Sequence, residues 1–221
     1  MIRTRQEIAK TLDLACLKPP VTLNMIDRTI TTALIEGCAA VCVPSIYSQE
    51  VVHQLKNTHV HSCVVIGFPS GYGLGKWDEA HWAVDNGVQE IDFVINYGLF
   101  LSGDIATVVK EINRIIQTCE DSSAYSKAIL EICYLTPKQI RELSKICVGE
   151  GVDYLKTSTG FGTGGATLEA VRIMLEECKD THCKVKASGG IKTPELANMY
   201  LDIGCQRLGV GSLDCLPLGA C

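Results

Sequence analysis

The feature that most constrains the fold of this chain is a regular alternation of short β-branched runs with longer segments of helical period. Eight strands are predicted, over residues 11–15, 39–43, 63–68, 90–95, 127–132, 153–156, 183–187 and 206–210. Seven amphipathic helices are predicted between them, over residues 22–36, 47–57, 77–86, 104–118, 136–149, 167–179 and 194–203. Such an alternation is typical of a parallel sheet with helical crossovers.

Several predicted helix ends carry their own signals. Thr136 precedes Pro137 and is followed three residues later by Gln139, which is the pattern of a capping box with a first-turn proline. Thr193 and Pro194 repeat the threonine–proline start. Glycine follows four of the predicted helices, where a left-handed C-cap favours it, at positions 37, 87, 151 and 204.

Eight strand–helix units in 221 residues predict an α/β fold, a single (β/α)8 barrel domain over residues 1–221 with an extra N-terminal helix and a short C-terminal tail. A doubly wound open sheet is the alternative, but it normally carries a glycine-rich phosphate loop after its first strand. The segment "DLACLKPP" in that place contains no glycine. The tail "GSLDCLPLGAC" is too short for a full eighth helix.

Charge and hydropathy narrow the classes of partner. The net charge of −5, without a block of lysine and arginine, argues against nucleic-acid binding. No stretch approaches the eighteen apolar residues of a membrane span, and the first twenty residues lack the apolar core of a signal peptide. We therefore expect a cytoplasmic protein that contacts neither nucleic acid nor membrane.

Twelve cysteines are scattered through the chain without a C-x-x-C pair or a cysteine–histidine cluster at zinc spacing. Many lie in apolar runs, where a reduced cysteine behaves as a small core residue. His59 and His61 could share one face of a strand, but the sequence offers no third ligand nearby. We predict no metal and no cofactor.

Two lysines end neighbouring strands of the predicted barrel, where active sites of this fold lie. Lys156 ends "DYLK" and Lys186 lies in "CKVKA", on strands about 5 Å apart. Two inward ammonium groups in a confined mouth would favour loss of a proton, and a neutral amine forms Schiff bases with carbonyl compounds. The alternative is a pair of solvated lysines that point outward.

Other polar residues end strands on the same side. Asp92 interrupts the apolar run "EIDFVI", and a carboxylate there would hydrogen-bond with the lysines and pass protons; the alternative is a structural ion-pair partner. The first strand offers Asp13. Cys42 ends the second and is a candidate substrate contact, with an inert core thiol as its alternative.

Small residues after three strands predict room for a substrate and a phosphate site. Thr157 and Thr159 follow Lys156 and could donate hydrogen bonds to a substrate. The segments "SGGIK" at 188–192 and "GVGS" at 209–212 end the last two strands, where barrel enzymes often bind phosphate through backbone N–H groups. The residues alone therefore indicate a phosphorylated carbonyl substrate.

Four motifs together resemble the deoxyribose-phosphate aldolase family: "AVCVPS", "EIDFVIN", "DYLKTSTGFGTGGAT" and "VKASGGIKT". The resemblance implies a (β/α)8-barrel class I aldolase of deoxyribonucleotide catabolism that needs no metal and reversibly cleaves 2-deoxyribose 5-phosphate to glyceraldehyde 3-phosphate and acetaldehyde. It implies Lys156 as the Schiff-base lysine, Lys186 as the lysine that perturbs it, and Asp92 as the proton relay supported by Asp13. The implied phosphate contacts are Gly160, Gly189, Gly190, Gly211 and Ser212.

The chain departs from the family pattern in places. Ala15 and Cys16 stand where the family usually has threonine and leucine, and the loop "GFPSGYGLGKW" is shorter than usual. The chain ends in Cys221 instead of tyrosine. Two rival interpretations stay open: a Schiff-base barrel acting on another sugar phosphate, and a silent barrel that only binds one. A homodimer and a homotetramer are both compatible with the sequence.

Overall fold

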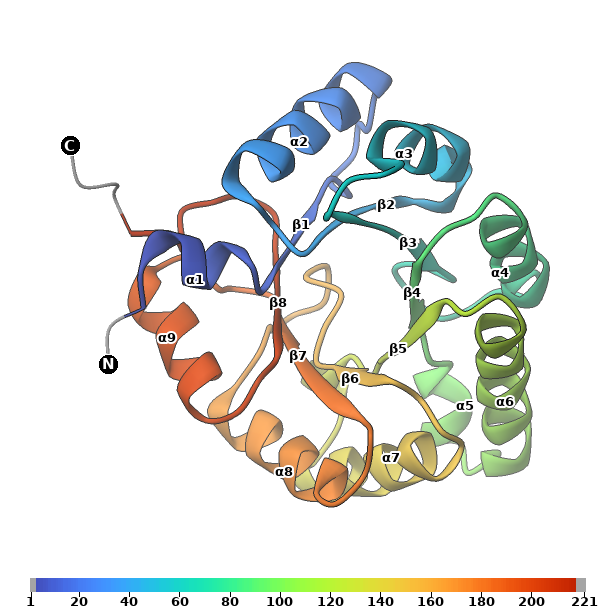
Figure 1. Ribbon diagram of the computed structural model, residues 1–221. Coiled ribbons are helices and arrows are strands. Elements are labelled where there is room, and N and C mark those ends of the chain that lie inside the picture. The colour runs from blue at the N-terminus through green and yellow to red at the C-terminus, as the bar shows by residue number, and fades with distance from the viewer. Residues whose placement is uncertain (1–2, 218–221) are drawn as a thin grey trace.

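Eight parallel strands close into a barrel in the computed structural model, which describes residues 3–217 (Figure 1). Each strand pairs with its neighbours in chain order, and β1 pairs with β8 to complete the ring. The closed ring rules out the open doubly wound sheet. The strands are β1 (Leu12–Ala15), β2 (Ala40–Pro44), β3 (His61–Ile66), β4 (Glu90–Val94), β5 (Tyr125–Ile129), β6 (Tyr154–Lys156), β7 (Lys184–Ser188) and β8 (Arg207–Val210).

Helices surround the barrel and follow the strands in turn (Figure 1). They are α1 (Arg5–Ala9), α2 (Leu23–Glu36), α3 (Ser48–Leu55), α4 (Lys76–Asp85), α5 (Tyr97–Leu101), α6 (Ile105–Asp121), α7 (Pro137–Gly149), α8 (Leu168–Cys178) and α9 (Pro194–Asp202), with short 3-10 turns η1 (Ser45–Tyr47) and η2 (Ile132–Tyr134). No helix within residues 3–217 has the length and apolarity needed to cross a membrane.

The predicted barrel, its eight strands and its N-terminal helix are confirmed. Thr136 and Gln139 form the expected capping box, and Gly37 adopts the left-handed conformation after α2. Strands β3 and β5 begin two residues earlier than predicted, and the short helix α5 was not predicted. Residues 211–217 contain no helix after β8, as expected, whereas the end of the predicted tail, residues 218–221, lies outside the described residues.

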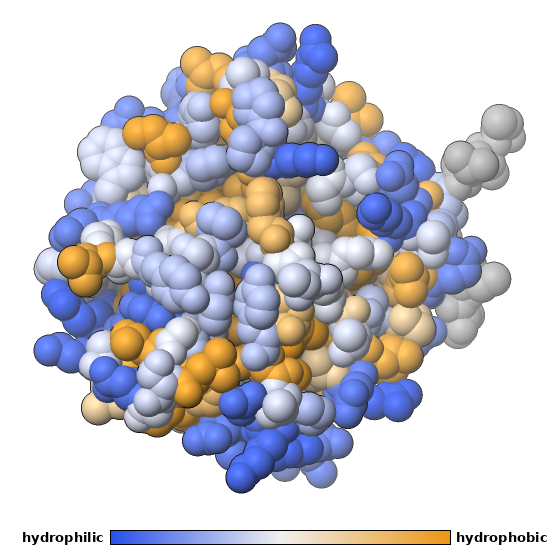
Figure 2. Space-filling view, turned by 180° about the vertical axis from the view of Figure 1, so that it is seen from behind, coloured by the Kyte–Doolittle hydropathy of each residue, from blue (hydrophilic) through white to orange (hydrophobic). Residues whose placement is uncertain are grey.

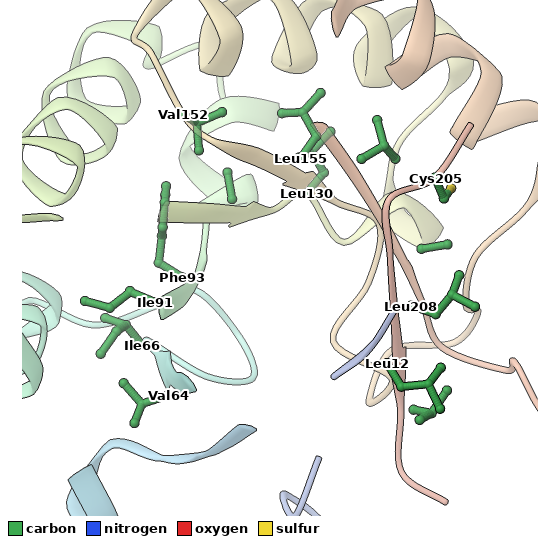
Figure 3. Packing of buried hydrophobic residues seen from close by; sticks show 14 of the residues in the cluster. Leu12, Val64, Ile66, Ile91, Phe93, Leu130, Val152, Leu155, Cys205 and Leu208 are labelled. Carbon is green, nitrogen blue, oxygen red and sulfur yellow. The ribbon is translucent and has the colours of Figure 1, made fainter. Parts of the chain in front are cut away.

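The outer face of the barrel carries the hydrophobic core. Figure 3 shows Leu12, Ile91, Phe93, Leu155 and Leu208 among the side chains of this layer, and all five are fully buried. These residues alternate along their strands with residues of the inner face, because successive side chains of a strand point to opposite sides of the sheet. Packing of the strands against the helices therefore leaves the inner face free for polar residues.

The inner face is divided between apolar and charged strands. Ala40, Cys42, Cys63 and Val65 form a small apolar cluster on β2 and β3. The inner residues of the other strands are mostly charged. Arg207 is partly buried, and the other six are buried: Asp13, Glu90, Asp92, Lys127, Lys156 and Lys186. A barrel interior of this kind is held together by ion pairs as well as by apolar packing.

Candidate active site

Asp92 lies at the centre of the charged interior and is fully buried. Its Oδ2 accepts hydrogen bonds from Lys156 Nζ and from Lys186 Nζ, each at 2.7 Å. Its Oδ1 accepts one from Lys127 Nζ at 2.8 Å. Strands β4, β5, β6 and β7 thus direct one carboxylate and three ammonium groups to the same point, and their register places Lys156 beside Lys186.

A second layer of ion pairs lies below Asp92, towards the amino ends of the strands. Lys127 also binds Glu90 at 2.5 Å, and Arg207 binds both oxygens of Glu90 at 2.5 and 2.6 Å. Arg207 Nε lies 2.9 Å from Asp13 Oδ1, while Asp13 Oδ2 accepts a hydrogen bond from Lys186. Asp13 therefore connects Lys186 to the lower ion pairs, and this network fixes the floor of the site.

Burial and charge act in opposite directions on these groups. Burial alone would raise the pKa of the Asp92 carboxyl, but the three neighbouring ammonium groups outweigh it and hold that pKa well below its usual range. Burial alone would lower the pKa of Lys186, but Asp13 and Asp92 outweigh it and raise that pKa. The pKa of Lys127 is raised in the same way, mainly by Asp92. Asp92, Lys127 and Lys186 are therefore held in their charged forms.

Lys156 has the weakest pairing among the cations of this network. Within residues 3–217, Lys127 lies within ion-pair distance of three carboxylates and Lys186 of two, whereas Lys156 has only Asp92. The network brings four basic side chains together with three carboxylates, and Arg207 stays charged at any ordinary pH. Lys156 is therefore the cation of this network with the fewest carboxylate partners.

A cavity of about 670 Å³ opens above the two lysines at the carboxyl ends of the strands. Figure 2 shows this face of the molecule, with apolar and weakly polar residues near its centre and hydrophilic residues around them. Lys156, Lys186 and Asp13 line the cavity, together with Ala15 and Cys42. Exposed cations lie at its rim: Lys18, Arg28 and Lys192. The cavity suits an anionic small molecule that reaches down to a lysine.

All five residues of the predicted phosphate site line this cavity: Gly160, Gly189, Gly190, Gly211 and Ser212. Within residues 3–217, none of their backbone N–H groups donates a hydrogen bond to another residue. Gly189 also needs to be glycine, because its φ is 89° and a Cβ would lie 2.8 Å from the Cα of Gly165. Unpaired N–H groups in a cavity wall are suitable anion ligands.

The hydroxylated residues after Lys156 lie in different places. Thr159 lines the cavity, as a substrate contact would. Thr157 does not: its hydroxyl donates to the carbonyl of Ser188 at 2.9 Å and accepts from the N–H of that residue at 2.9 Å. Thr157 therefore ties β6 to β7, and the cavity does not include it.

Cys42 lies at the cavity wall, and its Sγ is 3.5 Å from the Sγ of Cys63 on the next strand. Cys63 also lies 3.2 Å from Asp92 Oδ1. The ligand atoms of these three residues lie within 4.8 Å of one another, which is a spacing that could hold a metal. Three ammonium groups contact the same carboxylate, however, and their positive charge opposes a cation there.

The structure thus brings Lys156, Lys186, Asp92 and Asp13 together beneath the five residues of the predicted phosphate site. The sequence interpretation missed Lys127, Glu90 and Arg207, although each has the strand parity of an inward residue. It also missed Glu131, which is 1% exposed and hydrogen-bonds to Thr159. Burial raises the pKa of the Glu131 carboxyl.

The fold and the site together define the chain as a (β/α)8-barrel enzyme, and comparison with known proteins gives its family. Residues 8–202 match the model of the DeoC/LacD family aldolases. A deoxyribose-phosphate aldolase from Treponema denticola is 37% identical over 93% of this chain and 96% of its own length. One from Brevibacillus brevis is 38% identical over 96% of this chain and 95% of its own length.

A solved structure described as a putative deoxyribose-phosphate aldolase from Coccidioides immitis superposes with a TM-score of 0.90 at 34% identity, and the match covers 96% of this chain and 84% of that one. The chain belongs to the DeoC/LacD aldolase family.

Proposed function

We propose that this chain is a class I deoxyribose-phosphate aldolase that reversibly cleaves 2-deoxy-D-ribose 5-phosphate to D-glyceraldehyde 3-phosphate and acetaldehyde. The names of its relatives support the substrate. The observation that carries the mechanism is the pairing of Lys156, which among the described residues 3–217 has one carboxylate partner and shares it with two other lysines. This lysine lies at the bottom of the cavity and is the nucleophile.

The neutral amine of Lys156 attacks C1 of the open-chain sugar, and the carbinolamine loses water to give a Schiff base. The protonated imine withdraws electrons, so that the bond between C2 and C3 breaks as the C3 hydroxyl loses its proton. Glyceraldehyde 3-phosphate leaves, and the remaining enamine takes a proton at C2. Addition of water then releases acetaldehyde and restores the amine.

Asp92 and Lys186 carry the protons of these steps. Asp92 Oδ2 lies 2.7 Å from both ammonium nitrogens, so one carboxylate can accept a proton from one lysine and return it through the other. Asp13 binds Lys186 from below and holds it in place. Lys127 fixes the other oxygen of Asp92 and so keeps the carboxylate oriented towards Lys156.

The phosphate of the substrate binds to the N–H groups of Gly160, Gly189, Gly190 and Gly211 and to Ser212. This placement puts the anion at one side of the cavity, near the exposed side chain of Lys192. The same cavity holds both products, a sugar phosphate and an aldehyde. We also propose that the chain forms a homodimer or homotetramer; a neighbour of 26% identity from Aeropyrum pernix is described as tetrameric.

Borohydride reduction in the presence of 2-deoxyribose 5-phosphate, followed by peptide mass mapping, tests the nucleophile. We expect a reduced adduct on Lys156 alone and its loss in Lys156→Arg. Lys192→Arg is a matched control, because Lys192 lines the same cavity but is exposed at its rim. An adduct on Lys186 with Lys156 unmodified would reverse the assignment.

A further inference from the structure

Glu131 is a buried acid that the reaction above does not use, and its backbone is unusual. Its φ is 54°, in the left-handed region that residues other than glycine seldom adopt. The N–H groups of Leu130 and Ile132, on either side of it, bind the consecutive carbonyls of Lys156 and Thr157. In a regular parallel ladder these two acceptors would be two residues apart, so Glu131 forms a bulge that re-aims its side chain.

The side chain of Glu131 holds the loop that follows β6. Its carboxylate accepts a hydrogen bond from the hydroxyl of Thr159, and the N–H of Thr159 lies 3.3 and 3.4 Å from its two oxygens. The oxygen of Thr159 in turn accepts a hydrogen bond from the N–H of Phe161 at 3.0 Å. One carboxylate therefore fixes both ends of the short segment that contains Gly160.

The loop is packed closely onto this acid. A Cβ at Gly162 would lie 3.2 Å from the Glu131 carboxylate and 2.7 Å from the Sγ of Cys133. Beside Gly160, by contrast, no atom of residues 3–217 other than the glycine and its two chain neighbours lies within 4 Å of the place that a Cβ would take, and its φ is 86°. The bulge thus supports one side of the loop, while the side at Gly160 faces the open cavity.

We propose that Glu131 is a positioning residue for phosphate binding: it fixes the Thr159–Phe161 turn so that the N–H of Gly160 points at the phosphate of the substrate. The inference rests on the proposed function and deepens it. A carboxylate suits this task because both hydrogen bonds from Thr159 need an acceptor. Oε2 accepts from both the hydroxyl and the N–H of Thr159, and Oε1 lies 3.4 Å from the same N–H. In an amide one of these oxygens is replaced by an NH₂ group, which would face a donor of Thr159 in either orientation.

The test compares Glu131→Gln with wild type on two substrates, 2-deoxyribose 5-phosphate and unphosphorylated 2-deoxyribose. We expect KM for the phosphorylated sugar to rise about tenfold, the usual result of losing one hydrogen bond to a charged group. We expect kcat/KM for 2-deoxyribose to stay within about twofold of wild type. Glu142→Gln, an exposed glutamate on α7, is the matched control.

Thr159 supplies a second variant that needs no change at the buried acid. Thr159→Val should reproduce the selective loss, and Thr159→Ser should retain wild-type KM, because serine keeps the hydroxyl. If Glu131→Gln does not fold, the valine variant decides by the same criterion. An equal loss of kcat/KM on both substrates would overturn the inference, since it would indicate a structural or catalytic role. An unchanged kcat/KM on both substrates would overturn it as well.

The proposed function and the role of Glu131 can fail independently of each other. Wild-type protein that cleaves neither sugar would refute the aldolase assignment. Calorimetric titration with inorganic phosphate then decides the inference by itself: weaker binding in both Glu131→Gln and Thr159→Val supports it, and equal binding in these variants and wild type overturns it.

Discussion

Replacing Lys186 by methionine should slow Schiff-base formation at Lys156 at neutral pH. Both ammonium nitrogens lie 2.7 Å from the same oxygen of Asp92, so they are at most twice that distance, 5.4 Å, apart. At this separation two like charges repel by about 3 kcal/mol with an effective dielectric constant of about 20. Loss of this repulsion should shift the pH midpoint of Lys156 reactivity upward by about two pH units.

The assay is the single-turnover rate of borohydride trapping on Lys156, measured from about pH 6 to pH 10 in wild type and Lys186→Met. We expect about a hundredfold loss at pH 7 that shrinks as pH rises, because the amine then loses its proton without help. Lys184→Met, at an exposed position two residues earlier on β7, is the control. An unchanged midpoint in Lys186→Met would refute the reasoning and leave Lys186 as a proton carrier only.

Two further predictions concern the ion pairs beneath the site. Lys127→Met should lower the free energy of unfolding by about 3–5 kcal/mol, because it leaves Glu90 and Asp92 buried beside one fewer cation; urea denaturation measures this, and a loss no larger than that of the exposed Lys145→Met would contradict it. Acid should destabilise the wild-type protein below about pH 4, because the pKa values of Glu90 and Asp92 are lower in the folded protein than in the unfolded chain. The two carboxylates contribute their full stability above the ordinary carboxyl pKa, and this stability is lost as the pH falls towards their pKa values in the folded protein. A free energy of unfolding that stays constant from about pH 6 to pH 3 would contradict this explanation.

The strands and most helices were predictable because each carries a local signal. Apolar periodicity marked the eight strands, and caps such as Thr136 and Thr193 marked helix starts. Strand β5 was placed two residues late because the prediction followed its apolar residues, whereas the ladder begins at the exposed Tyr125. Helix α5 is only five residues long, too short for a periodic pattern.

The lysines and Asp92 were predictable because they interrupt or end apolar strands, but the partners of Asp92 were not all found. Lys127 lies opposite Asp92 in the register of β4 and β5, and that register is a property of the fold. Glu90 and Arg207 begin their strands, at the opposite end from the one at which active sites of this fold lie. Glu131 had no signal, since its left-handed backbone cannot be inferred from a glutamate in an apolar run.

The burial of the ion-pair network separates two effects of dissolved salt. Asp92 and the lysines that bind it are buried, so dissolved salt screens their interactions much less than those of exposed charges. Lys18, Arg28 and Lys192 stand in solvent at the rim, and beyond about 8 Å their attraction for an anion is screened at physiological ionic strength. Ionic strength therefore acts mainly on the approach of a charged substrate and much less on the ion pairs at the floor of the barrel.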